Sequence, residues 1–445
     1  MRKQLFTAFM LAAFSAVTSL SLDAQEAMDL IKENPGRAAG VYHNYEPKLN
    51  GETPAPKNFS PFYISHYSRH GSRYHSSDYY FEKALTTLKK CSAKNLLTPQ
   101  GLRLKEEIER IEVSHRGMEG MLTQKGGKEQ QGVAERMYSH YPEVFKQKGK
   151  RVINCMSSVY PRALMSMVNF TDELKGLSPE EKFHFETGDI YMDTIAHDIY
   201  YSSAHDSKNR TEDSLRTATF NPDRLMSLLF NDPAKATEEM DGHSVQYFIR
   251  SVYLAGAIIQ DLDSEPLLDI FSLFTTEELY EQWWLFNIKT YANCCNSLEY
   301  GSRQSNSAKN LLENVTESAE RAIKKGSNTA ADFRFGHDTG LLPLVCMIGL
   351  DGFDKVMSIM DLKDSWFTFQ RIPMCSNLQM IFYKNKKDEI LVKFLYNEEE
   401  TGIPSLKSYS GPYYRWTDLK VYFDSLIRTA EAENAKLPKK EPEAA

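Results

Sequence analysis

The 445-residue sequence lacks a strong charge of either sign. Its formal net charge is −7, and its acidic and basic residues are mixed along the chain. Proteins that bind nucleic acid usually present a clustered basic surface, and this sequence has no such cluster. We therefore expect no nucleic-acid partner, and any site for an anion must be built locally from a few residues.

Long apolar runs are missing beyond the N-terminus. Residues 1–24 combine a basic start at Arg2 and Lys3 with a mostly apolar or small stretch from Leu5 to Leu22, and a plausible cleavage point follows Ala24. This pattern is typical of a cleaved signal peptide. No later stretch approaches the roughly 20 apolar residues of a membrane-spanning helix. The sequence therefore predicts an exported protein, periplasmic or secreted, without a membrane span.

A zinc-site spacing of cysteines is also absent. The six cysteines include no Cys-x-x-Cys pair, and Cys294 and Cys295 are adjacent on a predicted helix. Disulfides are permitted in an exported chain, but the sequence does not select a pairing. We expect mostly buried thiols or one or two bridges, and we predict no metal and no cofactor. The cysteines are Cys91, Cys155, Cys294, Cys295, Cys346 and Cys375.

An apolar content of 41% in a chain of this length can form a large core, and the sequence has no internal repeats. We predict an α/β fold in which helices flank a mixed sheet. Its two parts are residues 25–174 and 328–433, where β-prone runs precede helices. Residues 175–327 have long amphipathic segments and few strand signals, which predicts a mostly α-helical insertion. Residues 434–445 are predicted to be a flexible tail.

The central motif follows a β-prone run at 62–64. Arg69 and Arg73 bracket His70 and Gly71, and guanidinium groups suit an oxyanion that is held by several hydrogen bonds. The glycine lets the backbone approach a ligand. An imidazole between two cations stays neutral and available as a nucleophile. An isolated Arg-His-Gly triplet is more often a solvated basic loop, so this interpretation requires partners elsewhere in the chain.

Two further junctions can supply those partners. A short strand predicted at 151–156 leads to a helix with Arg162 near its N-terminus, where amide donors and the helix dipole favour an anion. A strand predicted at 331–335 leads to His337 and Asp338 before another helix. In isolation, Arg162 is equally typical of an arginine in the solvated first turn of a helix. In isolation, His337-Asp338 is more often a helix cap beside a histidine without a role.

Local patterns also predict element boundaries. Thr123 is the expected N-cap of one helix, and Asp338 or Thr339 that of another. Residues 366–396 alternate apolar and polar side chains on both sides of a polar turn at 384–388. This pattern predicts an antiparallel hairpin that extends the sheet.

Taken together, these motifs resemble the histidine phosphatase superfamily, in its branch of histidine acid phosphatases and phytases, which includes the multiple inositol polyphosphate phosphatases. The match is carried by Arg69-His70-Gly71-Ser72-Arg73, by Arg162 after Ser157-Ser158, and by His337-Asp338. Weaker support comes from residues 122–126 and 391–397. The resemblance covers nearly the whole mature chain, and it implies an α/β core whose sheet edge holds the site and a helical insertion that shapes substrate access.

The resemblance also implies roles for individual residues. His70 would attack phosphorus and become a phosphohistidine, and Asp338 would protonate the leaving alkoxide and then activate water. The groups that would bind the phosphoryl oxygens are Arg69, Arg73, Arg162 and His337. The implied substrate is a small phosphomonoester, with phytate or other inositol phosphates first. The alternatives are a broad or sugar-phosphate acid phosphatase and a non-catalytic phosphate-binding protein on the same fold.

Two positions depart from the pattern of the family. A proline usually stands two residues after the second arginine, but this chain has His75 there, so Tyr74 and His75 form a candidate specificity loop. The inositol polyphosphate phosphatases usually have His-Ala-Glu where this chain has His337-Asp338. The sequence therefore leaves the substrate open, and it does not predict an oligomeric state.

Overall fold

The computed structural model describes five segments of the chain, namely residues 22–48, 51–146, 151–195, 220–301 and 303–436. The predicted signal peptide lies outside these segments except for its last three residues, where the first helix begins. The predicted flexible tail lies outside them from residue 437 onward. Of the helices within the described segments, none combines the length and the apolar character needed to cross a lipid bilayer.

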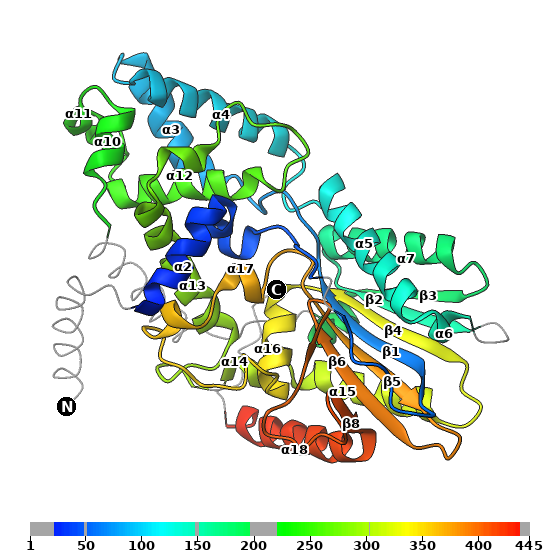
Figure 1. Ribbon diagram of the computed structural model, residues 1–445. Helices are drawn as coiled ribbons and strands as arrows, with labels where there is room; N and C mark the ends of the chain where they lie inside the picture. The colour runs from blue at the N-terminus through cyan, green and yellow to red at the C-terminus, as the bar shows by residue number, and fades with distance from the viewer. Residues whose placement is uncertain (1–21, 49–50, 147–150, 196–219, 302, 437–445) are drawn as a thin grey trace, which may run out of the picture.

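A mixed eight-stranded sheet forms the centre of the structure (Figure 1). Its strands are β1 (Ser60–Arg69), β2 (Val152–Ser157), β3 (Lys182–Thr187), β4 (Thr329–Gly336), β5 (Asn377–Lys384), β6 (Ile390–Tyr396), β7 (Glu399–Thr401) and β8 (Tyr413–Arg415). Their order is β3-β2-β4-β1-β5-β6-β7, and β8 pairs with β6. Strands β3, β2, β4 and β1 are parallel, and the remaining pairings are antiparallel. The predicted α/β class with a mixed sheet is confirmed.

Helices cover both faces of this sheet. One face packs against α5 (Gln124–His140), α6 (Pro142–Phe145) and α7 (Pro161–Leu177), and the other against α15 (Lys309–Ile323), α16 (Asp338–Ile348) and α18 (Trp416–Asn434). Alternation along β1 explains the two layers, because successive side chains of a strand point to opposite faces. Ile64 joins the core beneath α5 and α7, whereas Tyr63 and Tyr67 join the other core.

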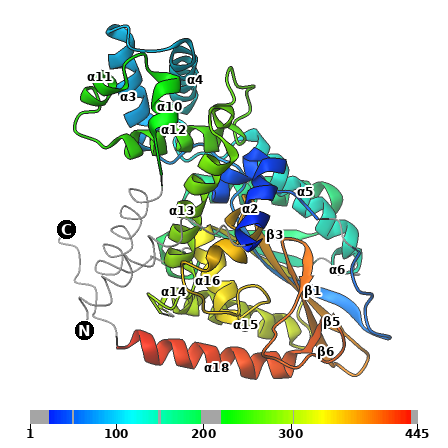
Figure 2. The same cartoon turned by 60° about the vertical axis from the view of Figure 1, so that its left-hand side comes forward.

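A group of helices gathers apart from the sheet, and Figures 1 and 2 show it at the top of the molecule. We call this group the cap; its members are α3 (Tyr79–Ala93), α4 (Pro99–His115), α10 (Asp223–Leu229), α11 (Pro233–Glu238) and α12 (Val245–Ile259). The remaining helices are α2 (Leu22–Glu33), η2 (Pro35–Tyr42), η3 (Asp189–Tyr191), α8 (Met192–Ile195), η4 (Ile270–Leu273), α13 (Thr276–Cys294), α14 (Arg303–Asn306), η5 (Leu362–Asp364) and α17 (Thr368–Arg371). The cap draws on residues before and after 175, and β3 lies inside the segment predicted to be mostly helical. The domain limits given above stay predictions.

One of the predicted N-caps is confirmed, whereas the other N-cap and the end of the first strand differ from the prediction. Strand β1 continues past Ile64 to Arg69, so the first arginine of the motif is a strand residue. Thr123 caps α5 as predicted, because its Oγ1 accepts a hydrogen bond from Gly126 N at 3.1 Å. The N-cap of α16 is His337, so the prediction of Asp338 or Thr339 is wrong by at least one residue.

The predicted hairpin and the cysteines are also described. Strands β5 and β6 pair in antiparallel register, which confirms the hairpin, although its first strand begins at Asn377 and not near Trp366. The six cysteines are buried thiols, and the structure contains no bridge between them.

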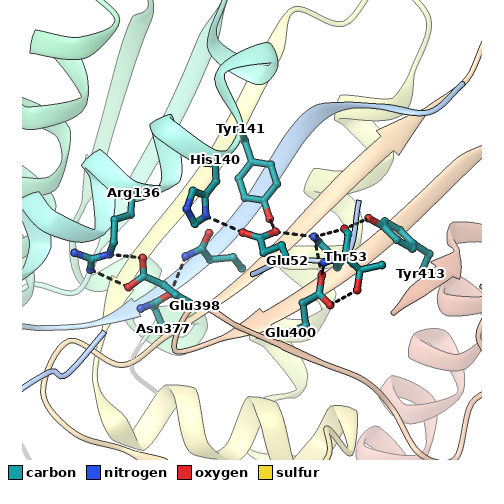
Figure 3. A network of polar contacts seen from close by, with 11 residues as sticks. Glu52, Thr53, Arg136, His140, Tyr141, Asn377, Glu398, Glu400 and Tyr413 are labelled. Atoms are coloured by element: carbon teal, nitrogen blue, oxygen red, sulfur yellow. Dashed lines mark hydrogen bonds and ion pairs between the residues drawn. The ribbon is translucent and has the colours of Figure 1, made fainter. Parts of the chain in front are cut away.

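A polar network holds residues 51–59, the segment directly before β1, against the sheet (Figure 3). Glu52 accepts hydrogen bonds from Lys393 Nζ at 2.6 Å, from His140 Nδ1 at 2.7 Å and from the hydroxyl of Tyr141. Lys393 is almost fully buried and also donates to Glu400 at 3.0 Å. A buried ammonium group needs such compensation, because an unpaired charge in the interior is strongly destabilising. The network therefore anchors the segment that precedes β1.

Candidate active site

Arg69 lies at the carboxyl end of β1, next to the carboxyl end of β4. Its side chain is buried, and Nη1 donates to the carbonyl oxygens of Val41 and Ile372, each at 2.7 Å. Nη2 lies 3.5 Å from Oδ2 of Asp338. Backbone oxygens from two distant segments therefore hold the guanidinium group in one orientation beside the carboxylate.

His70 begins the loop after β1 and is also buried. Its backbone N–H donates to the carbonyl oxygen of Gly336 at 3.0 Å, and its Nδ1 lies 2.9 Å from the carbonyl oxygen of Gly71. A carbonyl oxygen only accepts, so Nδ1 carries the proton. The Nε2 lone pair of His70 is therefore available for attack.

Two more guanidinium groups rest on aromatic rings. Arg73 lies 5.3 Å from the ring centroid of Tyr42 and donates to the carbonyl oxygen of Tyr74 at 2.8 Å. Arg162, in the first turn of α7, lies 4.8 Å from the ring centroid of Tyr160. The Nε atoms of both arginines are buried without a hydrogen-bond partner among the described residues. Both groups therefore retain donor capacity for an anionic ligand.

His337 and Asp338 complete the cluster from the start of α16. His337 Nε2 lies 2.9 Å from Oγ of Ser158, and its ring centroid is 5.5 Å from that of His70 and 5.2 Å from that of Tyr160. Asp338 is partly exposed, as is Arg162, whereas the other members of the cluster are buried. Asp338 and Arg162 are thus the members of the cluster that meet solvent.

The surroundings keep both imidazoles neutral. Burial lowers the pKa of His70 well below its usual value, and the charges of Arg69 and Arg162 lower it further. Burial and Arg162 also lower the pKa of His337. An imidazolium in this cluster would add a positive charge beside three guanidinium groups, which opposes its formation.

Burial and neighbouring charges also shift the pKa of Arg162 and that of the Asp338 carboxyl group. Burial and the neighbouring Arg73 lower the pKa of Arg162 to about 10. Burial by itself would raise the pKa of Asp338, but Arg69, His337 and Arg73 together hold it below the usual value. Without a ligand, Asp338 is therefore ionised and balances part of the positive charge.

The loop itself is seated on two helices. The N–H of Gly71 donates to Oγ of Ser166 on α7 at 3.1 Å. The N–H of Ser72 donates to the Glu129 carboxylate on α5 at 2.7 Å, and Oγ1 of Thr123 donates to the carbonyl oxygen of Ser72 at 3.0 Å. These bonds fix the loop backbone, so the arginines on either side of it have a rigid base.

The structure thus brings all six predicted chemical residues to one edge of the sheet, namely Arg69, His70, Arg73, Arg162, His337 and Asp338. The candidate specificity loop differs from expectation. Tyr74 is partly buried, whereas the His75 imidazole is fully buried and stacks on Tyr80 of α3 at 4.7 Å. A direct contact between His75 and a substrate would require this ring to leave its buried position.

Sequence reasoning missed several supporting groups. Ser158 and Tyr160 contact His337, and both precede Arg162 closely enough in the sequence to have been considered with it. Tyr42 supports Arg73 from a distant segment that has no motif of its own. Among the described residues, no group of three or more His, Cys, Asp and Glu side chains is arranged to hold a metal ion.

A mixed α/β sheet with guanidinium groups, a neutral imidazole and a carboxyl group at one edge defines an enzyme of the phosphatase class. The family model described as histidine phosphatase superfamily (branch 2) matches residues 67–397, which is more than half of the sequence. The chain belongs to the histidine phosphatase superfamily, branch 2, and it is a phosphatase.

Solved structures support the same fold. The multiple inositol polyphosphate phosphatase of Bifidobacterium longum, in complex with inositol hexasulfate, has a TM-score of 0.71 and 19% identity, over 87% of this chain and 97% of that chain. The phytase from D. castellii has a TM-score of 0.64 and 15% identity, over 94% and 89%. The apo form of Hafnia alvei phytase has a TM-score of 0.53 and 12% identity, over 86% and 100%. No curated protein sequence matches the chain significantly.

We predict that Gly71→Ala reduces both stability and activity. A Cβ atom at Gly71 would overlap the carbonyl oxygen of Gly126, a backbone atom of α5 that cannot move aside cheaply. The expected cost is about 1–3 kcal/mol of unfolding free energy, as for other overpacked sites. Urea unfolding and phosphate release per folded protein measure the two effects.

Gly176→Ala is the matched control, because a Cβ at this position of α7 meets no atom within 4 Å. It should stabilise the protein by up to about 1 kcal/mol through its higher helix propensity and leave activity unchanged. Wild-type stability and activity in Gly71→Ala would contradict the close seating of the loop on α5.

Proposed function

We propose that this phosphatase is an exported phosphomonoesterase that works through a phosphohistidine intermediate and acts on inositol phosphates such as phytate. The observation that carries the mechanism is the 2.9 Å contact between Nδ1 of His70 and the carbonyl oxygen of Gly71, which assigns the proton to Nδ1. The Nδ1 proton is engaged with the Gly71 carbonyl, which leaves Nε2 of His70 free among three guanidinium groups. A pure binding site would need the cations but not this nucleophile, nor a proton donor beside it.

In the first half-reaction, Nε2 of His70 attacks phosphorus and the bond to the leaving oxygen breaks. The groups that bind the phosphoryl oxygens are Arg69, Arg73, Arg162 and His337. They stabilise the negative charge on these oxygens in the transition state, which is the main task of a phosphoryl-transfer site. Asp338 donates its proton to the leaving alkoxide, which is otherwise a poor leaving group.

Substrate binding supplies that proton donor. The phosphate group brings negative charge next to Asp338 and neutralises the guanidinium groups that hold the pKa of this carboxyl group low. Its pKa therefore rises on binding, which favours the protonated form required for the first step. Departure of the alcohol then leaves Asp338 ionised, and in the second half-reaction the carboxylate accepts a proton from the water that attacks the phosphohistidine. Inorganic phosphate leaves and His70 is restored.

Inositol phosphates are the proposed substrates because the protein shares its fold with a multiple inositol polyphosphate phosphatase and with phytases. The pair His337-Asp338, in place of His-Ala-Glu, favours a sugar-phosphate or broad acid phosphatase as the second candidate. Export is proposed from the signal-like residues 1–24.

We predict that kcat/KM for phytate exceeds kcat/KM for glucose 1-phosphate and for an aryl phosphate. On the proposed assignment the site acts on a substrate with several phosphate groups, whose remote groups supply binding energy that a monophosphate cannot supply. Phosphate release measured in chelator across a pH series gives the three constants. Equal or higher constants for the monophosphates would reject the phytase assignment in favour of the second candidate.

We predict that His70→Ala abolishes phosphate release from every substrate, because no covalent intermediate can form. Acid quenching during turnover of a phosphate-labelled substrate should trap label on the wild-type protein and none on the variant. His66→Ala removes a buried histidine within β1, four residues before His70, and controls for the loss of a buried imidazole from this part of the chain. Substantial turnover by His70→Ala would rule out the phosphohistidine mechanism.

The protonation of Asp338 predicts an acidic pH optimum. Asp338 can donate a proton only below its pKa, and this pKa is lowered in the site without a ligand. Because kcat/KM reports the free enzyme, it should fall as the pH rises through the pKa of Asp338. Asp338→Asn cannot donate a proton, so it should slow alkyl phosphates by about 10² to 10⁴-fold. Aryl phosphates, with better leaving groups, should be slowed much less. Equal losses on both substrate types would contradict the donor role.

A further inference from the structure

The loop after β1, residues 70–75, is here called the phosphate-binding loop. His75 connects its end to three different segments. Its backbone N–H donates to Nε2 of His115 on α4 at 3.1 Å, and its carbonyl oxygen accepts from the N–H of Gly120 at 2.7 Å. Its side-chain Nε2 lies 2.9 Å from the carbonyl oxygen of Leu254, in the middle of α12. Two of these three bonds join the loop to the cap.

The protonation states follow from the acceptors. Nδ1 of His115 lies 2.8 Å from the carbonyl oxygen of Ile111, so Nδ1 carries its proton and Nε2 accepts from His75. Nε2 of His75 faces a carbonyl oxygen and must donate, while its Nδ1 has no hydrogen-bond partner among the described residues. The side chain of His75 therefore makes one directional bond, and that bond reaches the cap.

The ring of His75 also lies next to the support of Arg73. Its face stacks on Tyr80 of the cap at 4.7 Å, and it meets the ring of Tyr42 edge-on at 5.1 Å. The same Tyr42 ring carries the guanidinium group of Arg73. A continuous path of contacts thus runs from the backbone of α12 through His75 and Tyr42 to one of the phosphate-binding cations.

We propose that His75 is a positioning residue, whose hydrogen bond to the Leu254 carbonyl on the cap sets the orientation of Arg73 in the phosphate-binding loop. The inference rests on the proposed phosphatase function and adds a role to it. In this chain, the residue in place of the usual proline couples the cap to the site and does not touch the substrate.

The test separates the hydrogen bond from the packing of the ring. His75→Phe keeps an aromatic ring against Tyr80 and Tyr42 but loses the donor. His75→Gln replaces the ring but keeps an N–H donor at the end of a side chain of similar reach. If the bond orients Arg73 for the transition state, His75→Phe should lower kcat about tenfold or more with little change in KM, and His75→Gln should recover most of the loss.

His66→Phe is the matched control. His66 is also fully buried and stacks on an aromatic ring, that of Phe170 at 5.3 Å, but neither of its ring nitrogens has a hydrogen-bond partner among the described residues. The same substitution there removes no hydrogen bond, so its kcat should stay within about twofold of the wild type. Melting temperatures of all variants show whether the fold is kept.

Three outcomes would overturn the proposal. These are a folded His75→Phe with wild-type kcat, a loss that only follows the folded fraction, and a folded His75→Gln that is as slow as His75→Phe. If His75→Phe does not fold, Tyr42→Leu interrupts the same path and should lower kcat to a similar extent. A Tyr42→Leu variant that is folded and fully active would then overturn the proposal.

Wild-type turnover is measured first, so that failure of the proposed function is recognised separately. If the wild type releases no phosphate from any substrate, the proposed function fails. Calorimetric titration with vanadate, an anion that can adopt the five-coordinate geometry of the phosphoryl-transfer transition state, then tests the positioning role alone. His75→Phe should weaken vanadate binding about tenfold, with recovery in His75→Gln, and unchanged vanadate affinity in His75→Phe would reject the role.

Discussion

The structure of the site depends on holding three guanidinium groups around one neutral imidazole. Like charges at this separation repel, and burial removes the solvent that would screen them. The protein offsets this cost with carbonyl oxygens beneath Arg69, aromatic rings beneath Arg73 and Arg162, and the carboxylate of Asp338. The compensation is incomplete, as the lowered pKa of Arg162 shows. A phosphate group bound as proposed would supply the missing negative charge, and the deficit favours anionic ligands over neutral ones.

The supports of the site come from all parts of the chain. Val41 and Tyr42 belong to η2, Ile372 precedes β5, and Leu254 belongs to the cap. The groups proposed to carry the chemistry lie at the ends of β1 and β4 and at the start of α7. Because these supports are backbone oxygens or rings from η2, from the segment before β5 and from the cap, the geometry of the site depends on the correct assembly of these elements with the sheet.

Much of the fold was predictable because its signals are local. The N-cap at Thr123 and the hairpin of β5 and β6 follow from side chains a few residues apart. Strand β3 was missed because it is a short, largely exposed edge strand inside a stretch of helical texture. The end of β1 was placed too early, since pairing with β4 and β5 extends this strand through polar residues that have no strong strand preference of their own.

The sequence alone singled out the residues proposed to carry the chemistry, because only a few reactions require such residue types together. These residues are Arg69, His70, Arg73, Arg162, His337 and Asp338. The sequence also determined the α/β class, through local periodicity. Only the tertiary structure decided how these groups are held and charged, and where His75 lies. Its bond to Leu254 spans 179 residues and ends on a backbone carbonyl. Every residue has a backbone carbonyl, so no sequence pattern indicates which carbonyl accepts the hydrogen bond from His75.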